Sequence, residues 1–153
     1  MNSPASAAKQ LASFLAKFDP AIAKRIRACR TQMRKLMPTA IELVYDNYNA
    51  LAIGYSPTER TSDVVFSLAV YARGLNLYLM YGRSLPDPDG LLQGSGTQGA
   101  FIRLESLKTL DDPKVVDLIT RAIKRQKPTF AQKGRGYTVV KSVSAKQRPR
   151  RTG

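Results

Sequence analysis

The stretch DVVFSLAVYARGLNLYLMY, residues 63–81, decides the fold class of this chain. Its two halves, residues 63–71 and 75–81, are rich in valine, leucine, phenylalanine and tyrosine, residue types that favour β-strands. Arg73-Gly74 lies between the halves, and a short connection that contains glycine is typical of a tight hairpin. The sequence therefore predicts two antiparallel strands at the centre of the chain.

Two helices are predicted upstream of this hairpin. In the first, over residues 5–18, apolar side chains recur at the spacing of one helical face. They are Leu11, Phe14, Leu15 and Phe18. Asp19-Pro20 ends this helix and begins the next, because aspartate caps free amides and proline suits a first helical turn. The second helix, over residues 20–37, has an apolar side that includes Cys29 and an opposite basic side.

More strands are expected on both sides of the hairpin. Residues 41–45 and 50–55 precede it, and residues 101–105 follow it. Residues 84–99 hold two prolines and several glycines, so we expect a loop there.

A further helix is predicted over residues 112–126, where Asp112-Pro113 repeats the start signal. Helices and strands that are grouped separately along a chain are typical of an α+β fold. We therefore predict an antiparallel or mixed sheet of at least four strands, with two N-terminal helices and one C-terminal helix packed on it. The core is expected to include Phe14, Ile26, Met33, Val116 and Ile119.

The charge is distributed unevenly along the 153 residues. Residues 1–120 hold fourteen Lys/Arg and all eleven Asp/Glu, a net charge of +3. Residues 121–153 hold eleven Lys/Arg and no acidic residue, a net charge of +11. This asymmetry, with scattered glycine and proline near the end, predicts a domain over residues 1–126 and a flexible basic tail over residues 127–153.

Several kinds of chemistry are excluded by composition. The chain has no histidine and a single cysteine, Cys29. A Ser-His-Asp triad, a Cys-His dyad, a histidine zinc site and an intramolecular disulfide are therefore impossible within it. Asp87 and Asp89 lack the later ligands of a calcium loop. We predict no catalytic residue, no metal site and no cofactor, and a binding protein rather than an enzyme.

The location is predicted from apolar runs. The most apolar stretch, residues 64–72, is nine residues long, whereas a transmembrane helix needs about 20. The first residues do not resemble a secretory signal. The sequence thus predicts a cytoplasmic protein with no membrane partner.

Several strings together resemble the YdhG-like family, a group of small domains mostly of unknown function. They are ELVYDNYN at 42–49, the strands at 65–71 and 75–81, LLQGSG at 91–96, FIRL at 101–104 and DDP at 111–113. The resemblance covers residues 8–126 and implies an α+β fold without agreed catalytic residues. One branch is linked to frataxin-like iron handling, which the absence of histidine disfavours here.

Two groups of residues are candidates for binding a ligand. Gly94, Gly96 and Gly99 match G-x-G-x-x-G, but a dinucleotide site needs a strand before and a helix after this motif. The segment is either a flexible loop or a nest of backbone amides for an anion, with charge from flanking arginines. Residues 46–49 form either a turn or a pocket floor. The sequence favours a non-catalytic binding protein for a small anionic ligand, held by Asp46, Asn47, Tyr48, Asn49, Arg83, Gly94, Gly96 and Arg103.

The alternative function is that of a nucleic-acid-associated accessory protein. In this hypothesis the basic tail makes phosphate contacts that do not depend on base sequence. Its candidate residues are Lys133, Arg135, Lys146, Arg148, Arg150 and Arg151. Cutting the chain after Gln126 is expected to abolish such binding.

Overall fold

The computed structural model describes residues 4–152. Its α-helices are α1 (Pro4–Leu15), α2 (Pro20–Leu36), α3 (Leu107–Asp111) and α4 (Pro113–Arg125). Its strands are β1 (Ile41–Asp46), β2 (Leu51–Ser56), β3 (Phe66–Tyr71), β4 (Gly74–Leu79), β5 (Ala100–Leu104) and β6 (Thr138–Val143). In the described part of the chain, no helix has the length and apolar character needed to span a bilayer.

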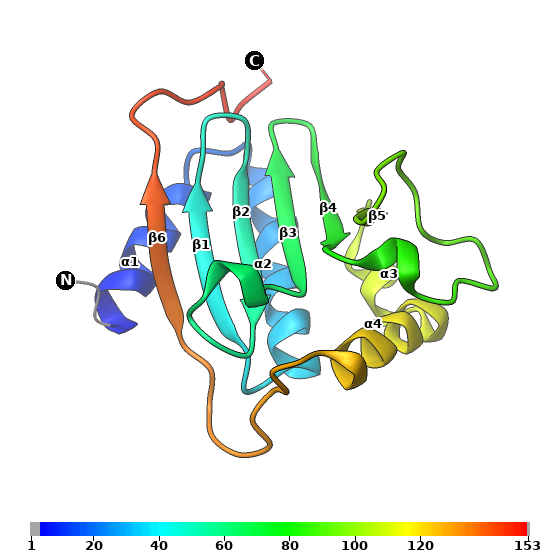
Figure 1. Ribbon diagram of the computed structural model, residues 1–153. Coiled ribbons are helices and arrows are strands. Elements are labelled where there is room, and N and C mark those ends of the chain that lie inside the picture. Colours follow the sequence, from blue (N-terminus) through cyan, green and yellow to red (C-terminus); the bar gives the residue numbers. More distant parts are fainter. Residues whose placement is uncertain (1–3, 153) are drawn as a thin grey trace.

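The strands form one six-stranded sheet in the order β5-β4-β3-β2-β1-β6. All neighbours are antiparallel except β1 and β6, which are parallel, so the predicted α+β fold with a mixed sheet is confirmed. The central hairpin is confirmed as well, because Tyr71 pairs with Gly74 and leaves Ala72-Arg73 as a two-residue turn. Figure 1 shows α1 and α2 behind the sheet and the two turns, β1–β2 and β3–β4, at its upper end.

The core lies between the sheet and the helices. Alternate strand residues such as Ile53, Leu68 and Leu77 are fully buried against α2, whose residues Ile26 and Met33 are also fully buried. The predicted core is confirmed for Phe14, Ile26, Met33 and Ile119.

Val116 is a correction, since it is only partly buried. The buried face of α4 is one residue out of the predicted register: Val115, Leu118, Ile119 and Ala122. These residues follow the spacing i, i+3, i+4, i+7 of one helical face.

The structure also corrects the prediction of a flexible tail beyond residue 126. Residues 138–143 form the edge strand β6, and residues 144–152 turn back across the upper end of the sheet, where Figure 1 shows the C-terminus. The segment that leads into β6 packs closely against the residue before β1: a Cβ on Gly136 would meet the carbonyl oxygen of Ala40 at 1.8 Å. Within β6, Val140 is buried in the main core and Val139 packs on the opposite face of the sheet.

Candidate functional site

Strand β1 places two buried carboxylates on its helix-facing side. Glu42 and Asp46 are 1% and 0% exposed, and they lie four residues apart at the two ends of the strand. A buried carboxylate destabilises a fold unless cations and hydrogen-bond donors surround it. The partners of these two groups therefore explain much of the polar architecture of the molecule.

Glu42 is held mainly by helix α2. Arg30 donates to it at 2.9 Å through both Nε and Nη2, and Arg34 Nη1 donates at 3.0 Å. The hydroxyls of Tyr55 and Thr138 donate at 2.9 and 2.8 Å. Burial and the neighbouring Glu42 charge raise the pKa of Tyr55 well above its ordinary value, so the phenol stays protonated as a donor. Both oxygens of the Glu42 carboxylate therefore accept hydrogen bonds from within the protein.

Asp46 is held by residues from both ends of the chain. Lys17, just after α1, donates to Oδ2 at 2.6 Å, and Arg150 donates to Oδ1 at 2.9 Å. Burial alone would raise the pKa of Asp46, but the hydrogen bonds from Lys17 and Arg150 outweigh burial and lower it. The prediction that Asp46 faces a ligand is wrong, because its side chain is buried in this ion cluster.

Arg150 is likewise removed from the predicted nucleic-acid surface. It is 5% exposed and also donates to the carbonyl of Asn47. Arg151 donates to the carbonyls of Ala16 and Lys17, where α1 ends. Of the six predicted contacts, only Arg150 is buried in the described chain; Lys133, Arg135, Lys146, Arg148 and Arg151 are exposed. Arg150 and Arg151 thus donate hydrogen bonds within the folded protein.

The rest of the predicted turn residues are exposed but do not share one cavity. Asn47 lines a hollow of about 250 Å³ on the open face of the sheet, opposite α1 and α2. Asn49 lines a different depression, beside the β3–β4 turn. Tyr48 is half exposed, with the Arg148 guanidinium 5.9 Å from its ring centroid. The proposed pocket floor is therefore split between two places.

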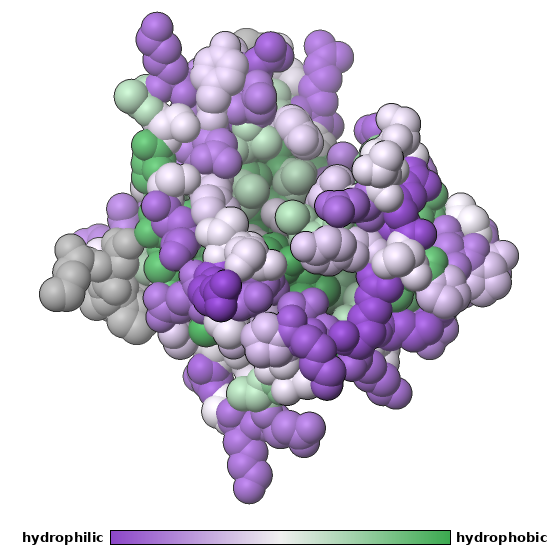
Figure 2. Space-filling model, viewed as in Figure 1, coloured by the Kyte–Doolittle hydropathy of each residue, from purple (hydrophilic) through white to green (hydrophobic). Residues whose placement is uncertain are grey.

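The hollow on the open face has an apolar floor of small side chains. Ala52 and Gly54 of β2 and Ser67 of β3 line it, and Figure 2 shows an apolar surface at the centre of this face. Two of its polar groups, the hydroxyls of Tyr45 and Thr61, share a hydrogen bond of 2.7 Å. No charged side chain lines it. It offers no attraction specific to an anion.

The glycine loop is organised around Arg83. The Nε atom of Arg83 donates to the carbonyl of Gly96 at 3.0 Å, and Gly94 has a φ of +109°. A strand follows this loop, as the sequence suggested, so the context of a dinucleotide site is absent. The Arg83 guanidinium holds a backbone carbonyl here, and Arg103 lines another cavity. The structure does not bring the two predicted arginines together.

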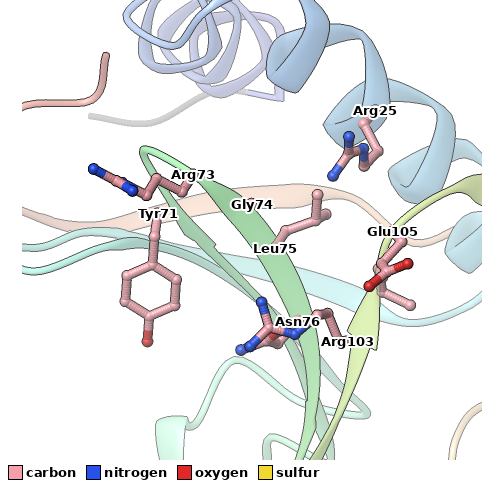
Figure 3. A pocket seen from close by; sticks show the side chains of 9 residues that line it. Arg25, Tyr71, Arg73, Gly74, Leu75, Asn76, Arg103 and Glu105 are labelled. Carbon is pink, nitrogen blue, oxygen red and sulfur yellow. The ribbon is translucent and has the colours of Figure 1, made fainter. Parts of the chain in front are cut away.

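Arg103 instead lies with two arginines that the sequence did not single out. A cavity of about 350 Å³ at the end of the β3–β4 hairpin is lined by Arg25 of α2, Arg73 of the turn and Arg103 of β5. We call it the arginine depression. Figure 3 shows these side chains around Leu75, with Glu105 as the one carboxylate among the lining residues. Over the described residues, none of the three guanidinium groups has a hydrogen bond or an ion pair within the protein.

Only tertiary structure reveals this site. Arg25, Arg73 and Arg103 come from a helix, a turn and an edge strand that are far apart in the sequence. Each is by itself an ordinary surface arginine. The one available signal is that none has a nearby acidic residue at helical or strand spacing, apart from Glu105 two residues after Arg103.

Two other kinds of site to consider are a reactive cysteine and a metal site. Cys29 is fully buried in the core, as predicted, and burial raises the pKa of its thiol to about 11. Among the residues that the structure describes, no three His, Cys, Asp or Glu side chains come together as a metal site would require.

Comparison of the chain with protein-family models, with curated proteins and with solved structures finds no match. The resemblance to the YdhG-like family therefore stays a prediction from the sequence.

Proposed function

We propose that this protein is a binding protein, rather than an enzyme, for a small anionic ligand, and that the ligand occupies the arginine depression. The observation that carries the proposal is a set of three arginines around one cavity of about 350 Å³ whose guanidinium groups have no hydrogen bond or ion pair within residues 4–152. Three other arginines are bound to buried carboxylates instead: Arg30 and Arg34 to Glu42, and Arg150 to Asp46.

The chemistry of guanidinium groups supports an anion as the occupant. Arginine presents a planar set of donors that matches a phosphate or carboxylate, and such charge-assisted hydrogen bonds are about twice as strong as neutral ones. Glu105 offsets one of the three positive charges, so the lining keeps a net charge of +2. The volume lies at the lower end of the roughly 300–1,000 Å³ typical of small-ligand sites.

Thermal unfolding tests the proposal. Inorganic phosphate and small carboxylates at millimolar concentration should raise the melting temperature of the full chain, because a ligand that binds only the folded state stabilises it. At 100 times Kd the gain is about 2.7 kcal/mol. Arg103→Ala should remove the shift.

The matched control is Arg60→Ala. Arg60 is an exposed arginine outside the depression, with only a 4.0 Å contact to Asp63, and its loss removes one positive charge as well. Its melting temperature should still rise with phosphate. An equal shift in Arg103→Ala and in the parent protein, or no shift with any anion, would contradict the proposal.

A further inference from the structure

A second depression adjoins the arginine depression and shares two of its residues. It has a volume of about 290 Å³ and is lined by Asn49, Tyr71, Arg73 and Arg148, among others. Tyr71 and Arg73 line both depressions. Figure 3 shows the Arg73 guanidinium pointing away from Arg25, so the cations are spread along the end of the hairpin. We call the two depressions together the basic groove.

The spacing of charge in the groove suits a chain of anions better than a single anion. Four arginines line it: Arg25, Arg73, Arg103 and Arg148. Glu105 is the one acidic residue in either lining. The guanidinium of Arg148 contacts the Tyr48 ring, and within residues 4–152 it donates no hydrogen bond. Among the described residues, none of the four guanidinium groups is held by a hydrogen bond or an ion pair, so each can donate to a phosphate.

Two tyrosines stand exposed beside these arginines. Tyr71 is 45% exposed in the groove, and Tyr48 is 50% exposed beside Arg148. An exposed aromatic ring within a basic groove offers a surface on which an unpaired base can stack. Bases in a duplex are already stacked on one another, so this combination favours a single strand over a double strand.

We propose that the basic groove binds single-stranded nucleic acid, with phosphates on the four arginines and a base stacked on Tyr71. This inference rests on the proposed function, because Arg103 serves both. It gives Arg148, from the segment that the sequence assigned to a flexible tail, a place on the surface of the folded domain. Contacts of this kind depend weakly on base sequence.

Fluorescence anisotropy with a labelled oligodeoxythymidylate of about 12 nucleotides tests the inference, since single-strand binding folds cover about 4–16 nucleotides. The full chain should bind it about tenfold or more tighter than thymidine monophosphate, because linked phosphates engage several arginines at once. With four phosphate contacts the logarithm of the binding constant should fall with the logarithm of salt at a slope of about −2.8.

Variants distinguish binding in the basic groove from attraction by the overall positive charge of the protein. Tyr71→Ala should weaken binding by about fivefold to a hundredfold, because the stacking of a base on the ring is lost. Tyr81 is 51% exposed but lies outside the groove, so Tyr81→Ala should leave binding unchanged. Arg73→Ala should weaken binding and make the salt slope shallower by about 0.7. Arg135→Ala, which removes an exposed arginine outside the groove, should change little.

The outcomes distinguish the two proposals. If phosphate stabilises the protein through Arg103 but the oligomer binds no tighter than the monophosphate, the proposed function stands and the inference falls. If neither phosphate nor oligomer binds, both fall. Equal binding of duplex DNA or polyglutamate, or equal losses in Arg73→Ala and Arg135→Ala, would also overturn the inference, because attraction would then be diffuse.

Discussion

Arg150 lies against Asp46, with 2.9 Å between its Nη2 atom and Oδ1 of the carboxylate. The contact joins the last residues of the chain to the first strand across 104 positions, and both side chains are almost inaccessible to solvent. Lys17 completes the cluster from the end of α1. The C-terminal segment is therefore part of the folded domain, and its charge is partly consumed in stabilising it.

Arg150→Ala should destabilise the protein by about 3 kcal/mol. Removing one partner of a buried ion pair leaves an uncompensated buried charge and costs about 3–5 kcal/mol. Because Lys17 still pairs with Asp46 in this variant, we expect a loss at the low end of this range. Urea unfolding measures the change. Lys146→Ala, four positions earlier and exposed, should stay within about 0.5 kcal/mol of the parent. A loss of less than about 1 kcal/mol in Arg150→Ala would show that the pair is not essential.

Truncation after Gln126 should unfold the domain rather than only abolish a binding function. The cut removes strand β6, the Thr138 donor to Glu42 and the Arg150 donor to Asp46. Near-ultraviolet circular dichroism and amide exchange report the loss of packing. A truncated chain that melts cooperatively at the temperature of the full chain would contradict the docking of β6.

Acid should destabilise the protein partly through Asp46. The folded-state pKa of this carboxyl is lowered, so its contribution is fully present above the ordinary value near 4 and is lost as pH falls through the folded value. The unfolding free energy, followed from about pH 6 to pH 3, should fall less steeply below pH 4 in Asp46→Asn than in the parent. Parallel curves would mean that Asp46 does not titrate differently on folding.

Gly136→Ala should also destabilise the fold. A Cβ at this position would meet the Ala40 carbonyl oxygen at 1.8 Å, so the approach to β6 must shift. Overpacking of this kind costs about 1–3 kcal/mol. Gly74→Ala is the control, because nothing lies within 4 Å of a Cβ built there. Equal stability of both variants in urea would show that the chain can relax at residue 136.

Local patterns were sufficient to predict the hairpin, α2 and most of the core. In residues 66–71 apolar side chains alternate along the strand, and in α2 Ile26 and Met33 recur at helical spacing. Each pattern involves residues close together in the sequence, so it can be recognised without knowing what the element packs against. In α4 the two adjacent valines, Val115 and Val116, allowed two registers, and only packing chooses between them.

The tail and the site depend on contacts between distant residues. The charge of residues 127–152 suggested solvation, but pairing with β1 and the buried carboxylate of Asp46 outweigh it. The sequence analysis paired Arg103 with Arg83 because the two are near in sequence, but they line different cavities. Arg25 and Arg73 meet it only after the sheet and α2 have packed.

The most direct test of the central proposal is a titration of the isotope-labelled full chain with inorganic phosphate, followed by amide chemical shifts. If the proposal holds, saturable changes appear at the residues of the arginine depression, Arg25, Arg73 to Asn76 and Arg103 to Glu105, and they are lost in Arg103→Ala. Changes confined to the glycine loop around Gly94, Gly96 and Arg83, or no saturable change at all, would contradict it.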